Sequence, residues 1–344
     1  MRLYPLIRPL AFAFDAETAH RLTIRALKLM PPRRPPDFPA SLGIRVAGID
    51  FPTPVGLAAG FDKDAEVPRQ MLSQGFGFVE VGTLTPRPQD GNPKPRLFRL
   101  SEDGAVINRL GFNNAGQAAA HRRLHEAMRR PGIVGVNIGA NKDSADRIAD
   151  YVAGVRAMAP VAKYLTINIS SPNTPGLRQL QDEGALKALL EAVKEARPEN
   201  GPPIFLKVAP DLGDGEPDQI VRVAIEHGVD AIIVANTTVS RPLLKSRFAS
   251  EPGGLSGRPL KGLALNALRD FRSALGGQIP LIGVGGIATA DDAWERIRAG
   301  ASLIQLYSAM VYEGPGIARH IASGLAARLK REGIGNISEL VGTA

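Results

Sequence analysis

The 344-residue sequence contains no cysteine. This absence excludes disulfide bonds, thiolate metal sites and a cysteine nucleophile, and it favours a reducing compartment. No apolar stretch reaches the roughly 18–20 residues that a helix needs to span a bilayer. The short apolar run between Arg2 and Arg8 precedes no small-residue cleavage site, so we expect no secretory signal. The lack of a long Arg/Ser-rich leader favours a bacterial chain over an organelle precursor.

Acidic residues are also scarce near the N-terminus. The whole chain carries a net charge of +8, and much of that charge lies in this segment. Residues 1–36 hold seven basic side chains against two acids, Asp15 and Glu17. No aromatic-interleaved basic motif accompanies them, so we expect no nucleic-acid partner. A solvated basic face and a membrane-surface element both remain open.

Residues 1–30 predict two helices. Leu3, Leu6, Ile7, Leu10 and Phe14 fall on one stripe at helical spacing. Asp15 is the expected N-cap of the second helix. The proline cluster at 31–36 ends that helix and predicts a stiff linker. Two interpretations stay open: a hairpin packed on the main domain as ordinary core, or a helix pair lying in a membrane interface.

After residue 50, strand and helix patterns alternate eight times. The strand candidates are near-continuous apolar runs, as expected for parallel strands covered on both faces, and lie at 53–60, 76–83, 132–140, 164–170, 203–210, 231–237, 279–286 and 303–308. The helical patterns lie near 64–74, 114–129, 144–158, 178–196, 217–227, 261–275, 290–299 and 315–331. The order predicts a (β/α)8 TIM barrel over 37–344, with the helix pair and linker of 1–36 as an appendage.

A doubly wound open sheet is the alternative fold. Its first strand should lead into G-x-G-x-x-G, and no predicted strand does. Two segments fall outside the alternation. Residues 43–51 predict a short hairpin at the barrel floor, and residues 96–107 predict a hairpin inserted after the second strand.

The active site of such a barrel forms where strands end and the following loops begin. The residues at those ends, together with the end of the 96–107 insert, make one coherent polar set: Ala58 to Lys63, Gly82 and Thr83, Asn108 to Asn114, Asn137, Asn168 to Thr174, Lys207, Asn236 to Thr238, Gly283 to Gly286, and Tyr307 with Ser308.

The last two strand ends favour a phosphate group, which such barrels commonly hold after strands 7 and 8. Gly285 and Gly286 allow close backbone approach to an anion, and a helix starting after Ser308 offers N–H donors. A second glycine-rich stretch at 253–257 adds support for a phosphate site. A plain turn glycine pair is the alternative interpretation.

The same set limits the chemistry. Glycoside hydrolysis needs two carboxylates across the bond, and the strand ends offer only Asp62. No ligand cluster for a hydrolytic metal is present, so we expect no metal. Flavin mononucleotide (FMN) fits better, because Lys207 would stabilise negative charge on a reduced ring while Asn137 and Asn168 would pair with its amide edges. Lys63 would bind a substrate carboxylate.

Together these motifs resemble the dihydroorotate dehydrogenases, and most closely their membrane-associated, quinone-reducing class 2. The likeness runs through essentially the whole chain, and the matching segments are 59–63, 108–113, 168–174, 236–238, 254–260 and 284–287. Three features favour class 2: the N-terminal helix pair, the stretch 96–100, and Ser171 where the soluble class carries cysteine.

The resemblance implies oxidation of (S)-dihydroorotate to orotate in pyrimidine biosynthesis, with one FMN per chain. Ser171 would be the base that removes the C5 proton, with Thr174 as its relay partner. The substrate-binding residues would be Lys63, Asn108, Arg109, Leu110, Gly111, Phe112, Asn168, Asn173, Asn236 and Thr237. The cofactor-binding residues would be Ala59, Gly60, Phe61, Asp62, Lys63, Thr83, Asn137, Asn168, Lys207, Ala235, Gly257, Gly286, Tyr307 and Ser308.

The resemblance also implies a task for the helix pair. It would lie on the cytoplasmic face of a bacterial inner membrane and form the mouth of an apolar tunnel for a membrane quinone, in a monomeric protein. His20, Arg99 and Tyr307 would be polar groups near the quinone head. One departure from the family pattern is Ala235, where threonine is frequent, which puts one flavin contact in doubt.

Two other functions stay open from the sequence. One is a flavin barrel oxidoreductase with a soluble acceptor such as fumarate or a nicotinamide, which would not need the helix pair. The other is a barrel that binds a phosphorylated ligand without redox chemistry, with the helix pair docking a partner.

Overall fold

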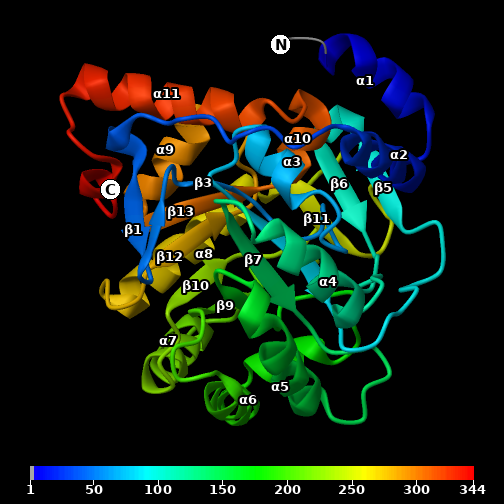
Figure 1. The fold of residues 1–344 in the computed structure, drawn as a ribbon, viewed down its shortest axis with the longest axis vertical. Coiled ribbons are helices and arrows are strands. Elements are labelled where there is room, and N and C mark those ends of the chain that lie inside the picture. The colour runs from blue at the N-terminus through cyan, green and yellow to red at the C-terminus, as the bar shows by residue number, and fades with distance from the viewer. Residues whose placement is uncertain (1–3) are drawn as a thin grey trace.

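The computed structural model describes residues 4–344 and shows a closed barrel of eight parallel strands in the order β10-β12-β13-β3-β4-β7-β8-β9 (Figure 1). The strands are β3 (Val55–Leu57), β4 (Phe78–Leu84), β7 (Ile133–Ile138), β8 (Leu165–Asn168), β9 (Ile204–Val208), β10 (Ala231–Val234), β12 (Leu281–Val284) and β13 (Ala301–Leu306). Barrel closure confirms the predicted TIM barrel and excludes the open doubly wound sheet.

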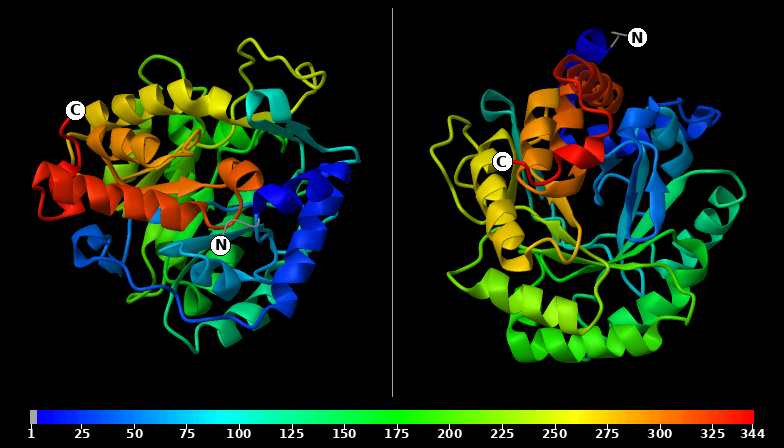
Figure 2. Two further views of the ribbon diagram at one scale, coloured as in Figure 1. Left: turned by 90° about the horizontal axis from the view of Figure 1, so that it is seen from above. Right: turned by 90° about the vertical axis from the view of Figure 1, so that its left-hand side faces the viewer.

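A ring of helices surrounds the strands, as Figure 2 shows from two further sides. It consists of α3 (Pro68–Ser73), α4 (Gln117–Ala127), α5 (Arg147–Met158), α6 (Glu183–Ala196), α7 (Glu216–Glu226), α8 (Lys261–Leu275), α9 (Ala290–Arg298) and α11 (Ile317–Glu332). A further short helix, α10 (Ser308–Glu313), directly follows β13. The strands start and end within a few residues of the predicted ranges, and most of their side chains are buried.

Both predicted hairpins are present. β1 (Ile44–Val46) pairs with β2 (Ile49–Phe51), and β5 (Leu97–Leu100) pairs with β6 (Ala105–Asn108). The second hairpin gains a third strand, β11 (Gly254–Gly257), from the loop that follows β10. The glycine-rich stretch at 253–257 is therefore largely a strand, because residues 254–257 pair with the far edge of the insert.

The N-terminal segment forms the two predicted helices, α1 (Tyr4–Ala13) and α2 (Ala16–Leu29). Asp15 caps α2 as predicted, and its carboxylate accepts the backbone N–H groups of Glu17 and Thr18. In Figure 1 the pair lies beside β5 and α10, at the opposite side of the molecule from β1. Residues 31–39, which follow α2 and lead toward β1, carry no regular secondary structure.

The predicted apolar stripe of α1 is largely unburied. Leu6 is 76% exposed, Ile7 53% and Leu10 67%, and Phe14 just after the helix is 46% exposed. Leu3, the first residue of that stripe, lies outside the described residues, as does Arg2. No buried residue is contributed by α1, whereas α2 buries Ile24 and Leu27. None of the helices within residues 4–344 is long and apolar enough to cross a bilayer.

Candidate active site

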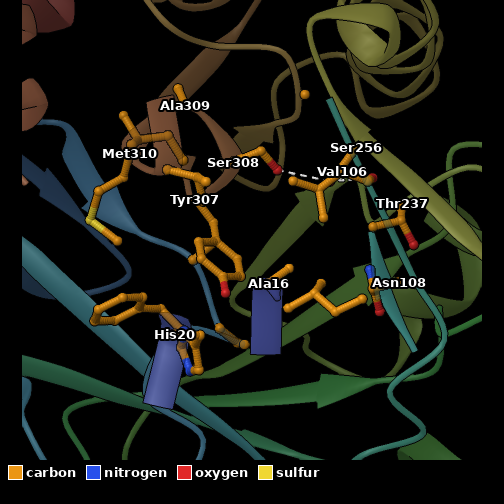
Figure 3. A pocket seen from close by; sticks show the side chains of 18 of the residues that line it. Ala16, His20, Val106, Asn108, Thr237, Ser256, Tyr307, Ser308, Ala309 and Met310 are labelled. Atoms are coloured by element: carbon orange, nitrogen blue, oxygen red, sulfur yellow. Dashed lines mark hydrogen bonds between the residues drawn. The ribbon is translucent and has the colours of Figure 1, made fainter. Parts of the chain in front are cut away.

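A cavity of about 460 Å³ opens at the carboxyl ends of the barrel strands and extends beneath the helix pair. α1 and α2 contribute one wall, with Phe12, Ala16, His20 and Leu27, and the barrel loops contribute the other. In Figure 3, His20 and Tyr307 lie on one side of this cavity, while Asn108 and Thr237 lie on the opposite side. The cavity is therefore polar at the barrel and largely apolar at the helices.

Most of the residues predicted for the site line this one cavity. From the barrel rim these are Ala59, Gly60, Phe61, Lys63, Thr83, Asn108, Leu110, Gly111, Phe112, Asn168, Ser171, Asn173, Lys207, Ala235, Asn236, Thr237, Gly257, Gly286, Tyr307 and Ser308. His20 and Arg99, the predicted quinone contacts, line it too. Four predicted residues are not on its wall: Asp62, Arg109, Asn137 and Thr174.

Asp62 and Arg109 instead hold the loops that carry their neighbours. The Asp62 carboxylate accepts the backbone N–H groups of Glu66 at 2.7 Å and Val67 at 2.8 Å, and burial raises its pKa to about 6. The Arg109 guanidinium donates to the carboxylate of Glu251 at 2.7 Å. Both side chains are committed to protein partners, which is why they turn away from the cavity.

Asn137 lies one layer below the cavity in a chain of directed hydrogen bonds. Its amide nitrogen donates to Glu80 at 2.7 Å, and its amide oxygen accepts from Thr83 at 2.6 Å and from Asn168 at 3.0 Å. The oxygen of Asn168 in turn accepts the Ser170 hydroxyl at 2.7 Å. The donors all point toward the Glu80 carboxylate, so the orientation of each amide is fixed by its neighbour.

Glu80 was not among the predicted site residues. Its fully buried carboxylate also accepts hydrogen bonds from Tyr164 at 3.2 Å, Thr166 at 3.1 Å and Gln305 at 2.8 Å. A sequence signal exists, because a charged residue interrupts the otherwise apolar run of the second predicted strand. A charge at such a position needs buried partners.

Two lysines bring positive charge to the polar end. Lys207, on β9, is 5% exposed, and burial lowers its pKa while Glu80 partly offsets that effect. Lys63 is partly buried, and burial lowers its pKa to about 8. Within residues 4–344, neither ammonium group has a carboxylate within 4.0 Å. Both cations are therefore available to an electron-rich or anionic ligand.

Ser171 follows β8 and is 5% exposed. Its hydroxyl oxygen accepts the backbone N–H of Asn173 at 3.2 Å, which fixes the loop, and the Asn173 amide donates to Asn108 at 3.2 Å. Thr174, the predicted relay partner, makes no direct hydrogen bond to Ser171. Its buried hydroxyl oxygen has no hydrogen-bond partner among the described residues.

The predicted phosphate loops meet at the cavity edge. Gly285, Gly286, Gly257 and Ser308 all line it, and the Ser308 hydroxyl donates to that of Ser256 at 2.8 Å (Figure 3). Gly286 has φ +71°, and a Cβ there would lie 2.4 Å from the Cα of Lys261. Only glycine fits this position, which brings backbone rather than side chain to the cavity.

The apolar end is built on aromatic contacts. The ring of Phe61 meets His20 edge-on at 5.3 Å and Tyr307 at 5.9 Å. Burial, together with the nearby Lys63 charge, lowers the pKa of His20 to about 3, so its imidazole is neutral. Arg99 donates to the carbonyls of Ala11 at 3.1 Å and Phe12 at 3.3 Å, at the carboxyl end of α1. These contacts join the helix pair to the barrel.

Ala235, the departure from the family pattern, is fully buried, and its backbone N–H donates to Val284 at 3.3 Å. Its methyl group supplies no hydrogen bond, so any polar contact from this residue comes from the backbone.

His121 and His125 lie four residues apart on α4, a spacing that helical zinc sites use. No group of three or more metal-ligating side chains is found in the part of the chain that the structure describes.

The donor set fits a flavin. A buried lysine without a carboxylate partner, an oriented set of amides and a glycine-lined backbone cradle correspond to an electron-accepting ring, its amide edge and a phosphate. The same cavity continues to the helix pair, so a second, apolar ligand has access to the site from that side.

Comparison with known proteins agrees with this geometry. The profile of the dihydroorotate dehydrogenase family matches residues 41–329. A protein of Erythrobacter litoralis named dihydroorotate dehydrogenase (quinone) is 65% identical over 341 residues, covering 99% of both chains. One of Novosphingobium aromaticivorans with the same name is 63% identical and fully covered. The crystal structure of Eimeria tenella DHODH in complex with ferulenol is 43% identical, with a TM-score of 0.90, covering 96% of this chain and 95% of that one.

Proposed function

The chain belongs to the dihydroorotate dehydrogenase family, in its quinone-dependent class, and on that premise we propose that it oxidises (S)-dihydroorotate to orotate and passes the electrons to a membrane quinone. The observation that carries the proposal is the single cavity that joins a lysine-and-amide end at the barrel to an apolar end under α1 and α2. A soluble acceptor would not require that second end.

The cofactor is a flavin, which we propose to be one FMN per chain. Lys207, Thr83, Asn137 and Asn168 would hold its ring directly or through one another. Gly257, Gly286 and Ser308 would hold its phosphate. A bound flavin would supply the acceptor for the hydride that leaves C6 of the substrate. Lys207 supports this role because a buried cation favours a neighbouring group that gains negative charge.

Substrate binding falls to the opposite side of the polar end. Lys63 would bind the carboxylate of dihydroorotate, and Asn108, Asn173, Asn236 and Thr237 would pair with its ring amides. Because the amides are held by one another and by the backbone, a ligand with the wrong pattern would leave buried donors unpaired. This supports strong discrimination for the dihydropyrimidine ring.

Ser171 would take the C5 proton. An isolated serine hydroxyl is a poor base near neutral pH, so the proton must move on as it is taken. Thr174 supports this role, because it lies three residues further along the same loop and its buried hydroxyl has no hydrogen-bond partner among the described residues.

We further propose that the protein is peripheral on the cytoplasmic face of a bacterial inner membrane and is monomeric. The exposed apolar side chains of Leu6, Ile7 and Leu10 support contact between α1 and lipid. His20, Arg99 and Tyr307 would surround the quinone head, with His20 neutral.

The test is anaerobic mixing of the purified protein with dihydroorotate while the flavin absorbance is followed. The wild type should bleach, and a short-chain quinone, but not fumarate or a nicotinamide, should restore the colour. S171A should keep flavin and bind orotate but bleach about 10²–10⁴ times more slowly. The control is S250A, which removes the hydroxyl of an exposed loop serine and should bleach at the wild-type rate.

Each outcome decides a separate point. A colourless protein, or a yellow one that dihydroorotate does not bleach, would rule out the proposed activity. An S171A variant that bleaches at the wild-type rate would leave the activity in place and remove Ser171 as the base.

A further inference from the structure

Glu17 lies in the first turn of α2 and connects the helix pair to the substrate end of the cavity. Its carboxylate accepts two hydrogen bonds from the Arg96 guanidinium, at 3.0 Å from Nε and 2.8 Å from Nη2. The Glu17 and Arg96 side chains are only 12% and 8% exposed. Lys94 is a further cation at this carboxylate, with its Nζ 3.6 Å away, but it is 58% exposed. A bidentate, largely buried ion pair of this kind has a defined geometry, and dissolved salt screens it only weakly.

Arg96 continues the connection into the loops around the substrate. Its Nη1 donates to the carbonyl of Asn92 at 2.7 Å, and the Asn92 amide donates to the carbonyls of Arg109 at 3.0 Å and Asn173 at 3.2 Å. Those two carbonyls belong to the segments that present Asn108 and Ser171. The contacts thus run from α2 to both substrate loops.

Glu17 also acts on the charge of Lys63. Burial lowers the pKa of Lys63 to about 8, and Glu17 is the leading charge that opposes this effect. Asp64 and Asp62 act in the same direction, whereas Arg96 lowers the pKa. His20 also faces Lys63 but carries no charge near neutral pH, since its pKa is about 3.

We propose that Glu17 is a positioning residue for substrate: it offsets the positive charges of Arg96 and of Lys63, which would bind the substrate carboxylate, and through Arg96 it holds the loops that carry Asn108 and Ser171. The proposal rests on the proposed function, because it takes the ligand at Lys63 to be dihydroorotate or orotate. The helix pair is then part of the substrate site as well as a wall of the apolar end.

The alternative is that the Glu17–Arg96 pair only anchors α2 to the barrel. A matched control is available, because the same helix makes a second ion pair to the barrel between Lys28 and Glu66. The substitution K28Q breaks that second anchor. The Lys28 side chain is 48% exposed, so this ion pair is far less buried than the Glu17–Arg96 pair. Lys28 is not among the charges that act on Lys63.

The experiment measures orotate affinity by calorimetry between pH 6 and 9.5, using the full-length, flavin-loaded protein in detergent. Orotate binding needs protonated Lys63, so wild-type affinity should fall above about pH 8. Without the Glu17 charge the pKa of Lys63 falls further, so E17Q should lose affinity at a lower pH. At pH 8 its binding should be about three- to tenfold weaker, since one pKa unit is a tenfold change. K28Q should follow the wild type.

The outcomes are distinct. An E17Q profile that matches the wild type overturns the proposal, as does an equal shift in K28Q. If E17Q does not fold, the double variant E17Q/R96M removes both partners of the pair, which is better tolerated than removing one. It should still bind orotate weakly at pH 7, because the loops lose their support, and wild-type affinity there overturns the proposal. Failure of the wild type to bind orotate would instead count against the proposed function.

Discussion

The side-chain amide of Asn137 donates to the carboxylate of Glu80 at 2.7 Å, below the polar end of the cavity. This one contact sets the direction of the hydrogen bonds above it, because a carboxylate only accepts and therefore holds the amide oxygen of Asn137 toward the cavity side. Glu80 lies in the middle of β4, so the orientation of site amides depends on a charge inside the barrel.

E80Q is expected to destabilise the protein and reduce its flavin content. Glutamine would place an NH2 group among four side chains that all donate to Glu80, leaving at least one buried donor unpaired. Each unpaired donor costs about 1–3 kcal/mol in the free energy of unfolding. Urea unfolding and the flavin-to-protein absorbance ratio measure the two effects.

The control for E80Q is E332Q, which removes a partly exposed glutamate paired with Arg328 at 2.7 Å. A surface pair of this kind should change stability by less than about 1 kcal/mol. Equal effects of the two substitutions would show that the buried acceptor is not what matters at Glu80.

G286A is expected to abolish flavin retention. Its Cβ would lie 2.4 Å from the Cα of Lys261, in a backbone conformation with φ +71° that alanine rarely adopts, so the cradle must move. G262A, next to Lys261 in α8, meets nothing within 4 Å and should keep wild-type flavin content. Affinity for FMN compared with riboflavin, by fluorescence quenching, separates loss of the phosphate contact from general unfolding. A G286A protein with full flavin content would argue against a phosphate site at this loop.

His20 is expected to contribute to loss of stability in acid. Its folded-state pKa of about 3 lies below the ordinary histidine value of 6.5, so the unfolded chain takes up a proton first as the pH falls. Stability due to neutral His20 is complete above pH 6.5 and is lost as the pH falls toward 3. Between pH 7 and pH 5 the loss is roughly 2 kcal/mol.

The corresponding measurement is urea unfolding of the wild type and H20F at pH 7 and pH 5. H20F should show a smaller difference in the free energy of unfolding between the two pH values. An unchanged difference would mean that folding does not lower the pKa of His20. H320F, at a histidine whose side chain is exposed, is the control.

Exposed leucines of α1 are expected to determine lipid binding. The double variant L6E/L10E places two charges where side chains are 76% and 67% exposed, so folding should be unaffected while co-sedimentation with anionic lipid vesicles is lost. L243E, at a fully exposed leucine in the loop between β10 and β11, should leave sedimentation unchanged. Sedimentation of L6E/L10E with the vesicles at the wild-type level would argue against α1 as the lipid contact.

Several features could be predicted from the sequence because they depend on local pattern. The alternation of apolar runs and amphipathic segments gave the barrel, and strand-end residues such as Lys63, Ser171 and Lys207 followed from the rule that such ends meet at one rim. Asp15 as a helix cap also followed, since capping involves only the next few residues.

Other features needed the coordinates because they join distant parts of the chain. Gly254–Gly257 forms a strand with Ala105–Asn108 of the insert, and nothing in the local sequence reveals that pairing. The motif position of Asp62 predicts a cofactor contact, whereas its carboxylate binds backbone N–H groups of its own loop.

The sequence by itself determined the barrel, the family resemblance and the polar character of the strand ends, because periodicity and motif order are properties of neighbouring residues. Only the tertiary structure decided which side chains face the cavity and which charges meet. Glu17 and Arg96 are 79 residues apart, and their pairing depends on how α2 packs against β5. The interaction between two buried charges depends on their distance in space, and the number of residues between them in the sequence does not reveal that distance.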